Sequence, residues 1–247
     1  GLAFGRLAAE FIRTKVVPEL DAFRFACYAG KPGIGSAEGT LASGADVIAA
    51  ISAAVTEMDE NEVPSDQRHL RITSTLLRAI KDMDSYKSRE VLESFASVKP
   101  VPQRRFYTAI EQLSGKDGEK AGGFRKYGKH YVKCAQGDTG ALEVILDSGS
   151  VSGAQIKAAD VTPVADPAYK PSAGDYVKAV AGAEINFMIL HTPALIQFQK
   201  HVAPKIISPE QNQHADAWKY GYRNVGIADV YANKLAGVFC HHKAAGV

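Results

Sequence analysis

The chain has 247 residues, with 29 Lys and Arg against 27 Asp and Glu and a formal net charge of +2. This length predicts one large domain or two small ones, with a core that buries roughly 70–75% of the unfolded surface. The charges are interspersed, which excludes a basic stripe for nucleic acid, and no run of ~18 apolar residues predicts a membrane span.

Three cysteines, Cys27, Cys134 and Cys240, lie far apart in the chain. An odd and scattered set predicts neither a disulfide framework nor a metal knuckle, so we expect buried thiols in a reducing cytoplasm. The first residues show no secretion signal. Because the chain does not start with Met, we expect its amino end to be incomplete.

The first predicted element is a long helix over 6–29, where apolar residues recur at steps of four and three. Pro18 lacks an amide donor and crowds the carbonyl of Thr14, which predicts a kink or two helices meeting near Val17. A second amphipathic helix is expected at 44–59, with Ser43 or Asp46 as its N-cap.

Shorter elements follow. Alternation around Leu70 and Ile72 predicts a strand, and Ser74 is a candidate cap for a helix over 74–83. An extended segment is expected between Val98 and Ile110. Residues 128–180 are interpreted as a β-rich insertion or loop system, with strand candidates at 143–146 and 176–180.

The final third predicts the centre of the core. Residues 185–191 are almost continuously apolar, as in a strand buried on both faces. Thr192 and Pro193 then predict a helix whose inward side chains are Leu195, Phe198 and Val202, ending at Pro204. Closing strands are expected at 220–223 and 235–240.

Motifs that carry catalysis are missing from the sequence. It has no P-loop, no dinucleotide fingerprint, no HExxH, no EF-hand loop and no GxSxG elbow. Gly30, Gly33 and Gly35 predict a turn between two helices. We therefore expect no enzyme, and neither catalytic residues nor a cofactor is assigned.

Metal binding is not expected either. Cys240, His241 and His242 are consecutive, and neighbouring side chains on a strand point to opposite faces. The remaining histidine candidates are scattered along the chain and are interpreted as satisfied or solvated: His191, His201 and His214. Four carboxylates near the end of the second helix lack the spacing of a calcium loop and are interpreted as a solvated helix end: Glu57, Asp59, Glu60 and Glu62.

Three aromatic residues, Trp218, Tyr220 and Tyr222, alternate with Lys219, Gly221 and Arg223. On a strand this spacing places the aromatic rings along one face. The pattern favours a sheet core or a subunit contact over a platform for stacking nucleic-acid bases.

Three stretches resemble the major capsid proteins of tailed phages, which have the HK97-type shell fold: Glu10–Arg24, Asp46–Pro64 and Asn186–Phe239. The first resembles the segment around the spine helix, the second a helix of the axial domain, and the third the return to the peripheral domain. The amino-terminal arm and extended loop of that family are not found ahead of the helix.

The resemblance implies an α+β fold of the HK97 type, with a peripheral domain made of a spine helix and a sheet, and an axial domain. It divides the chain into a spine helix at 1–35, an axial domain with its insertion at 36–210, and peripheral strands at 211–247. It also implies function through subunit contacts. The expected interface residues are Arg13, Lys15, Glu19, Asp21, Arg24, Trp218, Tyr220, Tyr222 and Arg223.

The implied partners are copies of the chain in hexamers and pentamers, together with a scaffolding protein, a portal and a maturation protease. Packaged DNA would be contacted only non-specifically, no membrane is involved, and the implied location is the virion capsid, assembled in the bacterial cytoplasm. Some shells of the family form an isopeptide with an asparagine of the peripheral domain. Asn233 lies in the corresponding region, but no lysine donor is found.

Two alternatives remain open. One is an encapsulin-like compartment of the same fold that encloses enzymes instead of DNA. The other is an α/β enzyme whose site residues converge only in space.

Overall fold

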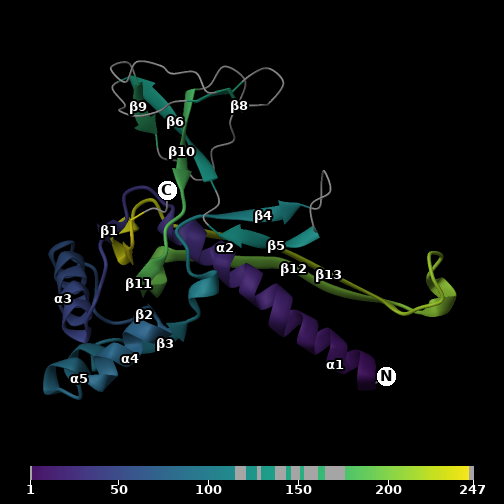
Figure 1. Ribbon diagram of the computed structural model, residues 1–247, viewed down its shortest axis with the longest axis horizontal. Coiled ribbons are helices and arrows are strands. Elements are labelled where there is room, and N and C mark those ends of the chain that lie inside the picture. Colours follow the sequence, from purple (N-terminus) through teal and green to yellow (C-terminus); the bar gives the residue numbers. More distant parts are fainter. Residues whose placement is uncertain are drawn as a thin grey trace.

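A computed structural model describes residues 2–114, 121–126, 129–136, 143–145, 151–152, 161–164 and 176–244 of this α+β protein (Figure 1). The helices are α1 (Leu2–Phe11), α2 (Val17–Ala29), α3 (Gly44–Glu60), α4 (Ser74–Asp82) and α5 (Tyr86–Glu93). The strands of the main sheet are β1 (Gly35–Glu38), β2 (Arg68–Thr73), β3 (Ser97–Val101), β11 (Ile185–His191) and β14 (Val238–His242).

The main sheet has the strand order β1-β14-β11-β2-β3. β11 occupies the centre, antiparallel to both β14 and β2, and all seven of its residues are buried. This confirms the predicted strand at 185–191. A parallel neighbour closes each edge, β1 beside β14 and β3 beside β2.

Helices cover both faces of this sheet, which is why β11 is apolar without interruption. On one face α3, α4 and α5 pack against Phe187, Ile189 and other residues of the sheet. On the opposite face Tyr28, near the end of α2, packs among Met188, Leu190 and Val238. Figure 1 shows the two helical layers on either side of the sheet.

The long amino-terminal helix contains a π-helical turn at Ile12–Val16, between α1 and α2. There the amide of Val17 donates to the carbonyl of Ile12, five residues earlier. Pro18 has no amide hydrogen, so the regular bond to Thr14 cannot form, and a local π-turn accommodates the interruption. The predicted irregularity near Val17 is confirmed, although the helical path continues through it.

The amino end of α3 has a reciprocal cap. The Ser43 hydroxyl accepts a hydrogen bond from the amide of Asp46, and the Asp46 carboxylate accepts one from the amide of Ser43. The predicted helix and its cap are confirmed. The cap predicted for the next helix is wrong, because Ser74 is the first residue of α4 and Thr73 precedes it without a side-chain cap bond.

Replacing Ser43 with Ala should lower the free energy of unfolding by about 1 kcal/mol, because the amide of Asp46 loses its acceptor. Ser74→Ala is the matched control, since that hydroxyl caps nothing among the described contacts, and it should change stability by less than about 0.5 kcal/mol. Urea titration measures both. Equal effects of the two substitutions would contradict the assigned cap.

Two further strands, β12 (Leu195–Ile207) and β13 (Lys219–Val230), pair with each other in an antiparallel two-stranded ribbon. The helix predicted at 193–203 is therefore wrong. Only the turn Thr192–Ala194 is helical. Leu195, Phe198 and Val202 fit a helical period by spacing, but Pro204 is tolerated in an edge strand, and pairing with β13 decides the conformation.

The remaining strands belong to smaller sheets. β4 (Ile110–Ser114) pairs with β5 (Ala121–Lys126). The sheet of order β8-β7-β10-β6-β9 is made of β6 (Lys129–Gln136), β7 (Glu143–Ile145), β8 (Val151–Ser152), β9 (Val161–Val164) and β10 (Tyr176–Ala181). The β-rich character predicted for 128–180 is confirmed for these strands, and the remainder of that range lies outside the described residues.

The segment expected to return to the peripheral domain, 211–247, divides between two sheets. β13 belongs to the ribbon, whereas β14 lies beside β11 in the main sheet. The extended segment expected at 98–110 includes β3 but also a short helical turn, Gln103–Arg105.

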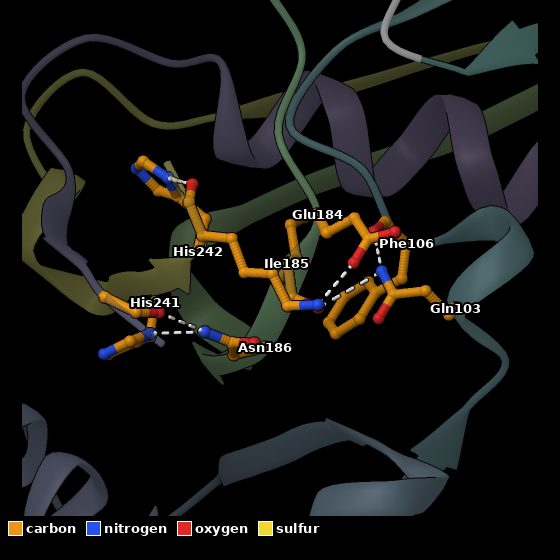
Figure 2. A network of polar contacts seen from close by, with 9 residues as sticks. Gln103, Phe106, Glu184, Ile185, Asn186, His241 and His242 are labelled. Carbon is orange, nitrogen blue, oxygen red and sulfur yellow. Dashed lines mark hydrogen bonds and ion pairs between the residues drawn. The ribbon is translucent and has the colours of Figure 1, made fainter. Parts of the chain in front are cut away.

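Buried polar groups join β14 to β11 and to the loop after β1 (Figure 2). The Asn186 amide nitrogen lies 3.0 Å from Nδ1 of His241 and donates to the carbonyl of Gly39 at 2.9 Å. Asn186 and His241 are both buried. Burial lowers the pKa of His241, and the neighbouring His242 lowers it further.

Stability should fall as the pH is lowered below the unfolded histidine pKa of 6.5. The folded pKa of His241 is depressed, so the unfolded chain binds more protons in this window and the stabilisation is lost as pH falls through the folded pKa. Burial also lowers the pKa of His69 and His191, which act in the same direction. Urea titrations at pH 7.5 and 5 should show this loss, and His241→Gln should reduce it. An unchanged pH slope in the variant would contradict the assignment.

Candidate subunit interface

The ribbon β12–β13 and the helical run 2–29 extend from the main sheet toward the same side in Figure 1, and together they are called the arm. Helix and ribbon are in contact. The rings of Phe11 and Tyr220 meet edge to face with centroids 5.8 Å apart. Nearer the sheet, the Tyr28 hydroxyl donates to Oε1 of Gln197 at 3.4 Å.

Strand alternation gives the ribbon two different faces. The inner face, which meets the helix, carries Tyr220, Tyr222 and Asn224, all of them partly buried. Arg223, Val225 and Ile227 alternate with these residues and are exposed on the outer face. Ile227 is directly opposite Phe198 of β12, so the two apolar side chains share the outer face.

Large apolar side chains are unusually exposed on the arm. Phe198 retains 59% and Ile227 60% of its accessible surface, and Val225 retains 48%. Others on the arm or beside it are Leu7, Phe11, Val17, Val202, Ile206 and Trp218. Single exposed apolar residues are normal, whereas a grouped set of this kind is typical of an interaction surface.

A cavity of about 440 Å³ lies between the helical run and the inner face of the ribbon. Phe11, Leu20, Tyr222 and Asn224 contribute to its wall, and the consecutive ribbon residues 198–199 and 226–228 border it. The amide oxygen and nitrogen of Asn224 are both buried, and neither has a hydrogen-bond partner among the described residues. Helix and ribbon therefore leave space between them despite their contacts at Phe11 and Tyr28.

Several charged residues predicted at the interface are engaged within the subunit. Arg13 pairs with Glu10 at 2.7 Å on the exposed side of the helix. Asp21 pairs with Arg105 at 3.0 Å, and burial nevertheless raises its pKa. The Glu19 carboxylate accepts a hydrogen bond from the amide of Gly123 at 2.9 Å, which ties α2 to β5.

The other predicted interface residues all lie on the arm. Lys15 is exposed on the π-turn, and Arg24 lines the cavity beside the inner face. Trp218 is exposed just before β13, whereas the half-buried Tyr220 and Tyr222 meet the helix. The predicted shared face is confirmed for Tyr220 and Tyr222, whereas Trp218 lies outside the strand. The assignment of these aromatics to a subunit contact stays a prediction.

The outer-face residues Phe198, Val225 and Ile227 were missed in the sequence. The sequence predicts a helix at 193–203 with Phe198 on its inward side. A helix has no strand partner, so this prediction gives no outer face to which Phe198 could belong. A signal was present in β13, where Arg223, Val225 and Ile227 occupy the alternate positions to the tyrosines. These alternate positions indicate a second face of the strand that is partly apolar.

The other residues considered in the sequence as nucleophiles or metal ligands lie in the core or form ion pairs. Cys240 packs in the core beneath α2, while His241 contacts Asn186. Burial raises the pKa of Cys240 to about 12 and that of Cys27 to about 11, so neither thiol is activated as a nucleophile. In the described ranges, no three His, Cys, Asp or Glu residues cluster as metal ligands would. The carboxylate of Asp59 pairs with Arg68 at 2.7 Å.

No protein-family model matches the chain, and a search of the curated proteins finds no match. Among solved structures, a chain from Mycobacterium phage Che8 is similar, with a TM-score of 0.46 and 11% sequence identity. The similarity covers 97% of this chain and 62% of that chain. Among the described residues, no helix has both the length and the apolar character needed to cross a membrane.

Proposed function

We propose that this protein is the structural subunit of an icosahedral phage head with the HK97-type shell fold. In this proposal the helical run 2–29 and the ribbon form the peripheral domain, and the main sheet with α3, α4 and α5 forms the axial domain. Copies assemble into hexamers and pentamers that enclose the genome. The resemblance of Glu10–Arg24, Asp46–Pro64 and Asn186–Phe239 to phage capsid proteins supports this assignment.

The observation that carries the proposal is the exposed apolar outer face of the ribbon. A two-stranded ribbon is only marginally stable by itself in water. The helix covers its inner face, whereas Phe198, Val225 and Ile227 remain exposed on the other. Contact with another subunit would remove this surface from water, and each apolar Å² buried contributes about 25 cal/mol.

The function then follows from geometry and not from catalysis. The arm and the main sheet present different surfaces, and closed assemblies use such surfaces many times, burying on the order of 2,000 Å² at an obligate contact. A scaffolding protein, a portal and a maturation protease are the further partners in this proposal, with DNA held non-specifically. Assembly would take place in the bacterial cytoplasm and end in the virion.

Negative-stain electron microscopy of the purified protein tests the proposal. We expect capsomer-sized rings or closed shells. A protein that stays monomeric at every concentration and salt condition would overturn it. Nucleic acid extracted from the shells supports a phage head, whereas shells that enclose only other proteins would replace this assignment with an encapsulin-like compartment.

A further inference from the structure

The outer face of the ribbon is positively charged beside its apolar patch. Strand alternation places Lys205, Lys219 and Arg223 on this face, toward the far end of the ribbon from Phe198 and Ile227. All three cations are exposed. The strands contain one carboxylate, Asp229, and Lys31 pairs with it at 2.9 Å. The free charge of the outer face is therefore positive.

A second surface of the same subunit has the opposite character. A cavity of about 380 Å³ lies between the loop after α3 and the turns that flank the base of the ribbon. The half-buried apolar residues Val63, Pro193 and Ala236 line it, and Glu62 and Asp66 are exposed at its rim. Apolar residues beside exposed polar ones are the usual anatomy of a protein interface.

The rim of this cavity remains acidic after its local contacts are counted. The end of α3 that leads into this loop carries two more exposed carboxylates outside the lining, Glu60 and Asp59, and Asp59 pairs with Arg68. Lys234 also lines the cavity, but its ammonium donates to the carbonyl of Pro193 at 3.3 Å and lies 5.8 Å from the centroid of the Tyr231 ring. The cavity is therefore lined by two carboxylates, Glu62 and Asp66, and by one cation, Lys234, that is already engaged.

We propose that the outer face of the ribbon of one copy docks over this acid-rimmed cavity of a second copy. Phe198 and Ile227 enter the cavity, and Lys205 and Arg223 face Glu62 and Asp66. The inference rests on the proposed function, because it names the contact by which copies associate. A second copy is the partner that the charges favour, since the chain itself carries both a basic apolar face and an acidic apolar recess. Complementary charge steers such an encounter and fixes its register.

A charge swap tests the contact. Lys205→Glu with Arg223→Glu should weaken association at least about tenfold, and Glu62→Lys with Asp66→Lys should weaken it by a similar factor. The protein that carries all four substitutions restores opposite charges and should associate within about threefold of wild type. Lys81→Glu with Lys87→Glu is the matched control, with the same charge change on exposed residues of α4 and α5, and should associate like wild type.

Sedimentation velocity over a concentration series measures these effects, and circular dichroism confirms that each variant is folded. If wild type associates but the fourfold variant stays as weak as the double variants, this docking is overturned while the proposed function stands. The same conclusion follows if the double variants associate like wild type. A wild-type protein that never associates overturns the proposed function itself and this contact with it.

Discussion

Replacing Phe187 with Ala should lower the free energy of unfolding by about 3–5 kcal/mol, the cost of emptying a fully packed aromatic site. Phe187 lies on the central strand β11 with no exposed surface. Its ring stacks on Phe239 with centroids 6.3 Å apart and on His241 at 5.1 Å. The substitution therefore removes contacts that join β11 to β14 beneath α3.

Phe198→Ala makes the same chemical change on the outer face of the ribbon and is the matched control. Its side chain is mostly exposed, so the folded monomer should lose less than about 0.5 kcal/mol. Urea titration of the monomeric protein measures both. If Phe187→Ala fails to fold, Phe187→Leu, with an expected loss of about 1 kcal/mol, provides the comparison. Similar losses for Phe187→Ala and Phe198→Ala would contradict the assigned core.

Replacing Arg68 with Met should lower the free energy of unfolding by about 3 kcal/mol, although the new side chain is similar in length. Arg68 is 3% exposed, and its guanidinium donates to the carbonyls of Pro64 and Val63 and to the carboxylate of Asp59. Met cannot donate to any of them. The loop between α3 and β2 loses the side chain that holds its backbone carbonyls.

Arg89→Met is the control for this second prediction. Arg89 also pairs with an aspartate, Asp84, but both side chains are largely exposed. An exposed ion pair contributes little to stability, so Arg89→Met should lower the free energy of unfolding by less than about 0.5 kcal/mol. Thermal unfolding followed by circular dichroism distinguishes the two variants. A loss for Arg68→Met no larger than that for Arg89→Met would show that burial of the guanidinium contributes nothing.

The main sheet and its helices could be predicted because their signals are local or nearly continuous. The apolar run at 185–191 indicates burial on both faces whatever its partners are. Ser43 and Asp46 lie three residues apart, so a cap is legible in the sequence itself. The strand containing Leu70 and Ile72 and the helix that follows are set by equally short patterns.

The ribbon could be predicted only in part. Leu195, Phe198 and Val202 satisfy a helical period, and nothing local to them requires a strand. Pairing with residues 219–230 overrides that propensity, because strand formation here depends on contacts distant in sequence. The tyrosines of β13 alternate with other residues, and this local pattern indicates a strand.

The candidate interface could not be predicted from the sequence, because it also depends on contacts between residues distant in the chain. Which side chains share the outer face follows from the register, in which Phe198 is opposite Ile227. The acid-rimmed cavity brings Glu62 and Asp66 together with Pro193 and Ala236, segments more than a hundred residues apart. Such convergence is a property of the fold and leaves no motif in the sequence.

Sedimentation velocity of wild type beside the variant with Phe198→Glu and Ile227→Glu tests most directly whether the arm exists to bind other copies. We predict that wild type forms larger species as its concentration rises, while this variant remains a folded monomer. Met83→Glu with Tyr86→Glu introduces the same two negative charges at exposed apolar residues beside and within α5, away from the arm, and should assemble like wild type. If the variant with Phe198→Glu and Ile227→Glu assembled at the same concentration as wild type, the arm would not be the surface that binds other copies.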